Sequence, residues 1–179
     1  MLRTKDILDE KDPRVRAKNT DVDFPLNDEY KDIIPEMLKH LRYSQIEKLS
    51  KKYDLRPGMG LAAPQLGINK NFFVVCYEVK DGIFDDYILI NPKVISYSEE
   101  MIYAGEGEGC LSVNREVEGI VPRHARITVE AYDLDGNKRK YRVREDLAIA
   151  FQHELDHLNG ILFVDYIDPK DPYKNADLY

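Results

Sequence analysis

Two histidines four residues apart constrain this chain more than any other feature of its sequence. Residues 153–157 read His-Glu-Leu-Asp-His, and on a helix both imidazoles of such a pair lie on one face, one turn apart, so that they reach one metal ion. The glutamate between them, Glu154, lies close enough to handle a proton on water held there. Residues 145–159 are predicted to be a helix, because acidic residues open the segment and Gly160 can close it. The sequence therefore predicts a helix that supplies two metal ligands.

A catalytic site of the zinc type needs a third protein ligand and one open position. No histidine follows His157, and the later acidic residues lie in a predicted strand and a polar tail. Upstream, Cys110 follows a glycine-rich stretch, 105–109, that allows close approach to a ligand. A cysteine beside glycine does not decide the matter, because a lone cysteine is most often a small buried hydrophobe. That reading is expected for Cys76, inside the apolar run 72–77.

The rest of the chain predicts an α+β fold, with mostly antiparallel sheets around the metal-binding helix and a further helix near the N-terminus. Apolar residues recur at helical spacing from 27 to about 53, where Pro35 predicts a kink or a late start. Asp135-Gly136 predicts a hairpin between two strands. Strands are expected at 71–79, 87–90, 94–97, 127–131, 141–143 and 161–164. No repeat or linker divides the chain, so we expect one domain that spans residues 1–179.

Charge and hydropathy narrow the choice of partners. The chain has 26 Lys and Arg against 33 Asp and Glu, a net charge of −7, whereas proteins that coat DNA or RNA carry the opposite balance. Direct nucleic-acid binding is therefore not expected. The longest apolar stretch, 72–77, is far shorter than the roughly 20 residues that cross a bilayer. The first residues look like neither a signal nor a transit peptide, and two cysteines suit a reducing cytosol. We expect a cytoplasmic monomer without membrane contact.

Three segments resemble the signature motifs of the peptide deformylase family. They read Gly-Met-Gly-Leu-Ala-Ala-Pro-Gln at 58–65, Glu-Gly-Cys-Leu-Ser at 108–112, and Gln-His-Glu-Leu-Asp-His-Leu-Asn-Gly at 152–160. The three occur in the family's order and at plausible spacing. The N-terminal helix and the long interval between the first two motifs are similar to the longer, Gram-positive type of deformylase.

The resemblance implies a hydrolase that removes the formyl group from formyl-methionine at the N-terminus of newly synthesised proteins, at the ribosome, and releases formate. It implies that Cys110, His153 and His157 hold one divalent metal ion, with water or hydroxide in the fourth position. Fe²⁺ is the implied working metal, and Zn²⁺, Ni²⁺ or Co²⁺ can occupy the same site. The residue types alone would not choose among these metals.

The resemblance also assigns catalytic roles. Glu154 is implied as the general base that takes a proton from the metal-bound water, and then as the general acid that delivers it to the leaving amine. The oxyanion of the tetrahedral intermediate needs donors that are already in place. The side-chain amide of Gln65 and the backbone N–H of Leu111 are implied as those donors.

Substrate selection is expected beside the metal. Ile149 lies four residues before His153, on the same helical face, so it would form the floor of a pocket one turn away. Met59 stands where the family normally has an aliphatic β-branched residue, and its thioether can still line an apolar pocket. By resemblance, the backbone of Met59, Gly60 and Gly109 pairs with the substrate as an added strand.

Charged and polar residues near the motifs are expected to support the site. We predict an ion pair between Glu108 and Arg123 that holds the Cys110 loop, as groups behind metal ligands often do. Asp156 is expected to orient a ligand or the helix rather than bind metal, and Gln152 is likewise a supporting residue.

Three alternatives stay open at the level of sequence. An endopeptidase could use the same helix motif, but it needs a third histidine or acidic ligand in a suitable place. A closed structural metal site needs a fourth ligand, and neither His40 nor His124 lies in a ligand-like pair. A relative that has lost activity would have no need of Glu154 and Gln65.

Overall fold

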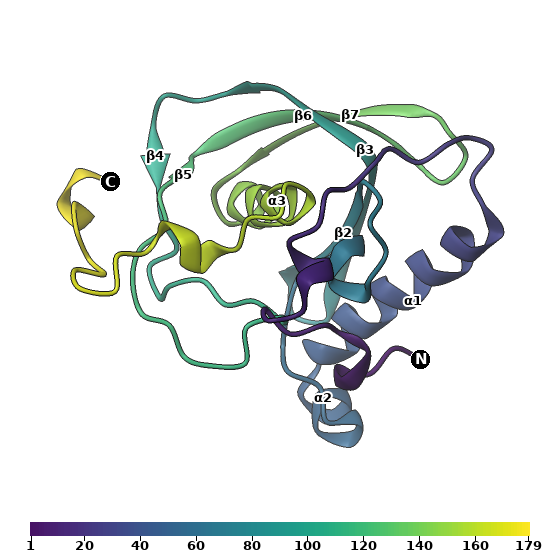
Figure 1. The fold of residues 1–179 in the computed structure, drawn as a ribbon, viewed down its shortest axis with the longest axis horizontal. Coiled ribbons are helices and arrows are strands. Elements are labelled where there is room, and N and C mark those ends of the chain that lie inside the picture. Colours follow the sequence, from purple (N-terminus) through teal and green to yellow (C-terminus); the bar gives the residue numbers. More distant parts are fainter.

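A five-stranded antiparallel sheet in the order β1-β2-β3-β6-β7 forms the centre of the molecule (Figure 1). The structure is a computed structural model that describes residues 1–179. A second, two-stranded sheet pairs β4 with β5. The helices are α1 (Asp28–Ser44), α2 (Glu47–Tyr53) and α3 (Glu145–Leu158), and the strands are β1 (Gly60–Ala62), β2 (Phe72–Lys80), β3 (Ile83–Tyr97), β4 (Met101–Ile102), β5 (Arg123–His124), β6 (Arg126–Tyr132) and β7 (Lys138–Arg144). The α+β class with antiparallel strands is confirmed.

The two faces of the sheet bury separate apolar clusters, one under α1 and one under α3. Strand β2 contributes to both, because successive side chains of a strand point to opposite faces. Phe72, Val74 and Cys76 pack in the cluster with α1. Phe73 and Val75 pack in the cluster with α3. The sheet thus holds α3, which carries the His-Glu-Leu-Asp-His motif, at a fixed position against one of its faces.

The first helical region is two helices rather than the single one predicted. The expected late start at Pro35 is wrong, because α1 begins at Asp28, where the Asn27 side chain accepts a hydrogen bond from the Glu29 N–H at 2.9 Å. Pro35 lies exposed within α1. Helix α1 ends at Ser44, and α2 begins at Glu47. Between them, the side-chain amide of Gln45 donates to the backbone carbonyls of Leu41 and Cys76, at 3.2 and 2.9 Å.

The two strands predicted on either side of Asn91-Pro92 are one strand, β3. A proline cannot donate to a sheet ladder, so it is tolerated where the ladder is interrupted. The register between β3 and β6 shifts between Ile90 and Lys93, and Asn91 has φ of 51°. The Asn91 side chain also bonds the backbone N–H and C=O of Val22, at 2.7 and 2.9 Å. This bulge lets β3 continue through the proline.

The hairpin predicted at Asp135-Gly136 is confirmed, because it joins β6 to β7. The strand predicted at 161–164 is wrong: the chain forms a short 3₁₀ helix at Phe163–Tyr166 instead. Its first turn is closed by the Asp165 carboxylate, which accepts a hydrogen bond from the Leu162 N–H at 3.0 Å. None of the helices combines the length and the apolar character that crossing a membrane requires.

Candidate metal centre

Helix α3 presents its two histidines as the spacing predicted. The ring centroids of His153 and His157 lie 5.1 Å apart. The helix begins directly after β7, and two acidic residues in its first turn, Glu145 and Asp146, complement the positive end of its dipole. Both rings are held where α3 packs on the sheet, since His157 is 1% exposed.

Cys110 comes from a distant loop and meets the two histidines. Its Sγ lies 3.2 Å from Nε2 of His157, and single ligand atoms from the three residues all lie within 4.8 Å of one another. With typical metal–sulfur and metal–nitrogen distances of about 2.3 and 2.1 Å, two tetrahedral ligands stand roughly 3.6 Å apart. One thiolate and two imidazoles in this arrangement fit a single divalent metal ion with room for a further ligand.

His157 is chemically suited to be a ligand. Burial lowers the pKa of its imidazole well below the usual value, so the ring is neutral. The neutral imidazole is the form that binds a metal ion.

The Cys110 sulfur receives two further donors. The backbone N–H of Ser112 lies 3.4 Å from it, and the Gln65 side-chain nitrogen lies 3.6 Å from it. The Gln65 amide is fixed at both ends, since its oxygen accepts from the Ala62 N–H at 2.9 Å and its nitrogen donates to the Ser112 hydroxyl at 3.0 Å. Ser112 belongs to the second motif, and the sequence alone assigned it no role. Its position two residues after the cysteine is the signal that could have identified it.

A buried charge network supports the centre from behind. The predicted ion pair is confirmed: Arg123 binds both oxygens of Glu108 at 2.9 Å, and it also binds Asp156 at 2.6 Å. Glu108 in turn accepts a hydrogen bond from Nδ1 of His153 at 2.8 Å, which leaves the other ring nitrogen for a metal. Burial would raise the pKa of Glu108, but the bonds from His153 and Arg123 outweigh it and lower this pKa below its ordinary value.

The supporting position of Asp156 agrees with the prediction, because it binds Arg123 and is not part of the ligand cluster. Gln152 fixes α3 to β5 through hydrogen bonds of 2.8 Å with the backbone N–H and C=O of His124. Both residues therefore act on the placement of the helix.

Glu154 is a carboxylic acid with one oxygen left free. It is 2% exposed, and its Oε2 has no hydrogen-bond partner. Burial raises the pKa of this carboxyl to about 7, although His153 opposes the shift. A Cβ at Gly60 would lie 2.8 Å from the Glu154 carboxyl carbon. Glycine at position 60 is therefore required for the close approach of β1 to this acid.

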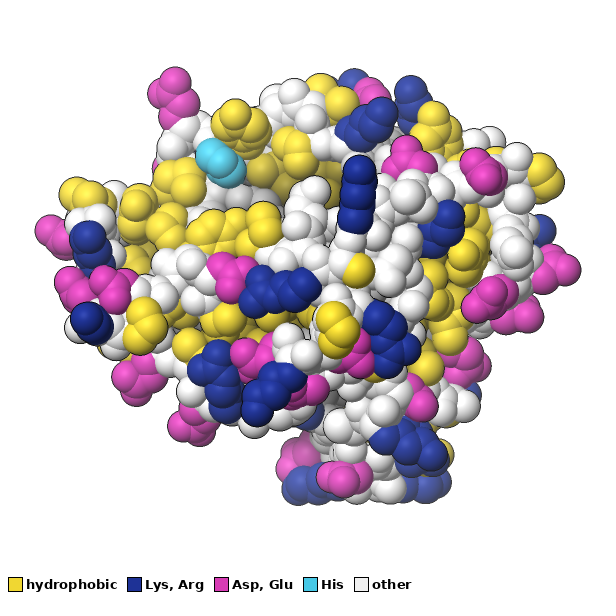
Figure 2. All heavy atoms as spheres, in the orientation of Figure 1, with side chains coloured by type: hydrophobic (Ala, Val, Ile, Leu, Met, Phe, Trp, Pro, Cys, Tyr) yellow, Lys and Arg dark blue, Asp and Glu magenta, His cyan; other side chains and the backbone are white.

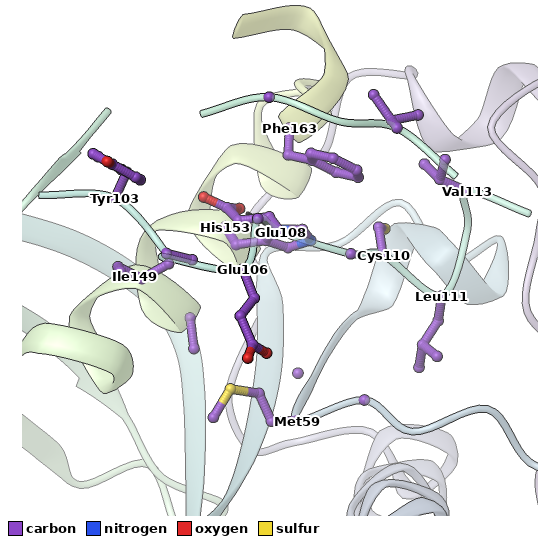
Figure 3. A pocket seen from close by; sticks show the side chains of 18 of the residues that line it. Met59, Tyr103, Glu106, Glu108, Cys110, Leu111, Val113, Ile149, His153 and Phe163 are labelled. Carbon is purple, nitrogen blue, oxygen red and sulfur yellow. Dashed lines mark hydrogen bonds and ion pairs between the residues drawn. The ribbon is translucent and has the colours of Figure 1, made fainter. Parts of the chain in front are cut away.

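A pocket of about 1100 Å³ opens onto these residues (Figure 3). Met59 lines it from just before β1 and Ile149 lines it from α3, and the Cys110 loop and the ring of His153 border the same space. The predicted site residues that line it are Met59, Gly60, Gly109, Cys110, Leu111, Ile149, His153 and Glu154. Gln65 and His157 are buried behind the wall of this pocket instead. The structure thus brings every predicted site residue into one region.

Two aromatic residues near the centre were not identified from the sequence. Phe163 stacks on the ring of His153 with centroids 5.9 Å apart and an interplanar angle of 24°. The Arg123 guanidinium lies 5.1 Å from the ring centroid of Tyr166. Both belong to the 3₁₀ helix at Phe163–Tyr166. A strand was predicted for residues 161–164, and this wrong prediction did not place either ring near the centre.

Comparison with known proteins agrees with this geometry. A sequence model of the polypeptide deformylase family matches residues 4–173. A peptide deformylase of Macrococcus caseolyticus is 50% identical over 175 residues, covering 97% of this chain and 95% of that protein. Peptide deformylase 2 of Bacillus anthracis is 45% identical over 177 residues, covering 99% and 96%.

Solved structures give the same result. A probable peptide deformylase from Synechococcus phage S-SSM7 superposes with a TM-score of 0.74 at 35% identity, covering 90% of this chain and 98% of that one. Peptide deformylase from Thermotoga maritima superposes with a TM-score of 0.70 at 33% identity, covering 91% and 97%. The relatives from Gram-positive bacteria match nearly the full length of the chain, in keeping with the longer type.

Proposed function

The chain belongs to the polypeptide deformylase family, and we propose that its pocket hydrolyses the N-formyl group of formyl-methionyl peptides with Glu154 as general base and general acid. Members of this family remove formyl groups from newly made peptides. One observation carries the assignment of roles: a buried carboxyl with a free oxygen stands in the pocket beside the cluster of Cys110, His153 and His157.

We propose that this cluster holds one divalent metal ion, Fe²⁺ in the cell, with Zn²⁺, Ni²⁺ or Co²⁺ as substitutes. When bound, such an ion supplies Lewis acidity, which lowers the pKa of a water ligand so that hydroxide forms near neutral pH. Support comes from the donor set and from the second nitrogen of His153, which Glu108 binds at 2.8 Å. A hydrogen bond of this kind fixes the tautomer and the ring orientation of a ligand histidine.

Glu154 is positioned to move the proton. Its free Oε2 would accept a proton from the attacking water, and the same oxygen would return this proton to the nitrogen of the leaving amine. The burial of this residue excludes bulk solvent, which would otherwise exchange the proton. The products of these two transfers are formate and a free amino terminus.

Two donors are available for the oxyanion of the tetrahedral intermediate. The Gln65 amide is held in place by its bonds to Ala62 and Ser112, and its second N–H, which points to the Cys110 sulfur at 3.6 Å, would exchange that long contact for the substrate oxygen. The backbone N–H of Leu111 makes no hydrogen bond within the chain. Donors that are already oriented are worth about 10²–10³ in rate each.

The substrate backbone is proposed to add a strand to β1. This strand lies at one end of the sheet order, paired only with β2, so its other edge is available. Met59 and Gly60 lie on that edge, and Gly109 lies on the loop that borders the pocket. Main-chain pairing would accept many sequences beyond the first residue, while Ile149 and the Met59 side chain would contact the substrate methionine.

Formate release from formyl-Met-Ala-Ser tests this proposal. The protein is loaded with Fe²⁺ or Ni²⁺ without oxygen and assayed beside Glu154→Ala. We expect the variant to keep its metal and to lose kcat by about 10²–10⁴, because the residue acts in the transition state. A wild type that cleaves casein internally and leaves the formyl group intact would show an endopeptidase. A variant that turns over as fast as the wild type would exclude Glu154 as the acid–base group.

A further inference from the structure

One part of the central sheet has a face that no helix covers. Helix α1 packs against β1, β2 and β3, and α3 packs against the opposite face. In β6 and β7, the buried residues Ile127, Val129 and Val143 point toward α3. The residues that alternate with them point the other way, onto a surface beyond the edge of α1. We call this surface the outer β6–β7 face.

This face is strongly basic within an acidic protein. Every second residue of β7 on this face is a lysine or an arginine. The strand register places Arg126 of β6 and Lys93 of β3 beside them. The cations are Lys93, Arg126, Lys138, Lys140, Arg142 and Arg144, and the carboxylates are Glu100 and Glu130. The local charge is +4, whereas the whole chain carries −7. In Figure 2, several Lys and Arg side chains lie along the upper margin, over the β6–β7 region, interspersed with hydrophobic and acidic side chains.

The cations of this face are only partly neutralised. Glu100 binds one of them at 2.9 Å, and Glu130 lies 3.9 and 3.8 Å from two more. Lys93, Arg142 and Arg144 are exposed and have no carboxylate partner. Cations left without partners on one side of an acidic molecule generate a local positive potential that its net charge conceals.

A groove of about 450 Å³ lies among these cations. Arg126, Arg142 and Arg144 line it together with Ser96 and Thr128. The register places Ser96, Thr128 and Arg142 in one row across β3, β6 and β7. Neither hydroxyl of this row makes a hydrogen bond within the chain. The groove therefore combines free guanidinium groups with free hydroxyl donors.

Contrary to the expectation from the net charge of the chain, we propose that the outer β6–β7 face binds the phosphate backbone of structured RNA. Alternate residues of β7 stand about 7 Å apart, a separation comparable to that of neighbouring phosphates along one nucleic-acid strand. Guanidinium groups bind phosphate through two parallel hydrogen bonds, and hydroxyls such as those of Ser96 and Thr128 also donate to phosphate oxygens. Val94, Ile95 and Tyr97 are exposed on β3 beside these cations, so an anionic membrane is the alternative that the experiment below has to separate from RNA.

RNA held on this face would leave the catalytic pocket accessible. The face lies on the opposite side of the sheet from α3, which carries His153 and Glu154. Deformylase activity on a short peptide therefore does not depend on this surface, and the inference stands apart from the proposed function.

Fluorescence anisotropy with a labelled 20-base-pair RNA hairpin tests the proposal on the full chain. If three phosphates are neutralised, the affinity should fall about 40-fold between 50 and 200 mM salt. Arg142→Glu with Arg144→Glu should weaken binding at least tenfold and flatten the salt dependence by about two charges. A second pair, Lys93→Glu with Arg142→Glu, avoids the residue next to α3 and should act in the same way.

Lys48→Glu with Lys52→Glu on α2 is the matched control, because it changes the net charge equally at a distant exposed site. We expect this control to bind RNA within threefold of the wild type, and all variants to release formate from formyl-Met-Ala-Ser at the wild-type rate. Equal loss in the control and in the face variants would overturn the proposal. So would equal or tighter binding of the wild type to phosphatidylglycerol vesicles or to poly-glutamate, since these would identify a membrane or an acidic protein.

Discussion

The two faces of the central sheet bury very different chemistry. Apart from His40 and Ser44, the buried residues under α1 are apolar. At the margin, Nη2 of Arg42 donates to both oxygens of Asp86 at 2.7 Å, and Arg42 is 42% exposed. Behind the metal centre on the α3 side, Arg123 is 3% exposed and binds Glu108 and Asp156. Removing charges from water costs several kcal/mol per ion. The fold therefore contains a buried ion-pair network where this network orients a candidate metal ligand, and its other ion pairs are exposed to solvent.

The two cysteines show the same contrast. Cys76 is fully buried among apolar residues on the α1 side, and burial raises the pKa of its thiol to about 12, with Asp86 adding to the shift. Cys110 is partly exposed in a loop, 3.2 Å from a histidine nitrogen. Of the two cysteines, Cys76 thus packs in an apolar core, and Cys110 is a candidate metal ligand.

The largest expected difference between the two faces is in the effect of removing their cysteines on metal binding and activity. We expect Cys110→Ala to lower metal affinity by more than the about 10–100-fold that loss of a group behind a ligand costs, and formate release should fall with it. Cys76→Ala should keep its metal and its turnover. Metal content after anaerobic purification, measured beside activity, checks both. Retention of a full complement of metal by Cys110→Ala would show that the sulfur is not a ligand.

The two arginine pairs give the next largest effect. Arg123→Gln leaves the buried Glu108 carboxylate and the partly buried Asp156 carboxylate without their arginine, so we expect a loss of about 3–5 kcal/mol in the free energy of unfolding. Arg42→Gln breaks an exposed pair with similar short contacts and should cost about 1 kcal/mol or less. Urea unfolding of both variants measures the difference.

The metal affinity of the same two arginine variants should differ as well. Arg123→Gln should weaken metal retention about 10–100-fold, because Glu108 then no longer holds His153 as firmly. Arg42→Gln should not change it. Equal stability losses in the two variants, with metal retention unchanged in both, would contradict a special role for the buried network.

Truncation in the α1 core should affect stability alone. Leu41 is 0% exposed within that cluster, so Leu41→Ala should cost about 2–5 kcal/mol through lost burial and the cavity left behind. We expect kcat per folded molecule to stay within twofold of the wild type, since no residue of that cluster is among the predicted ligands. A large fall in kcat at temperatures where the variant is fully folded would show that the two faces are coupled.

The sequence predicted the parts of this site that local pattern determines. The spacing of His153 and His157 requires only a helix, and helix α3 formed where periodicity and end signals agreed. The convergence of Cys110 depends on long-range packing, so it was accessible only through the resemblance to a family. The Glu108–Arg123 pair was expected, but its extension to His153 was not, because contacts across 45 residues leave no periodic signal.

The local errors have physical causes of the same kind. Asn91-Pro92 reads as a strand end, yet a bulge and the side-chain bonds of Asn91 carry β3 through it. The apolar run 161–164 reads as a strand, but its Phe163 is used to stack on His153. In both places a tertiary contact overrides the intrinsic preference of the segment.

The smallest expected effect is the pH dependence of the free energy of unfolding that the ionisation of the Cys76 thiol causes. Its thiol pKa is about 9 in the unfolded chain and about 12 in the folded one. A pKa raised by folding stabilises the native state below the unfolded pKa, and this contribution is lost as pH rises toward the folded pKa. Between pH 8 and 10.5 the wild type should therefore lose roughly 1–2 kcal/mol that Cys76→Ala does not lose. Urea unfolding of both proteins at the two pH values measures this, and the variant cancels the titration of tyrosines and lysines common to both. Parallel stability profiles would mean that the Cys76 thiol ionises in the folded protein as readily as in the unfolded chain, and the contrast between the two faces would then not extend to their cysteines.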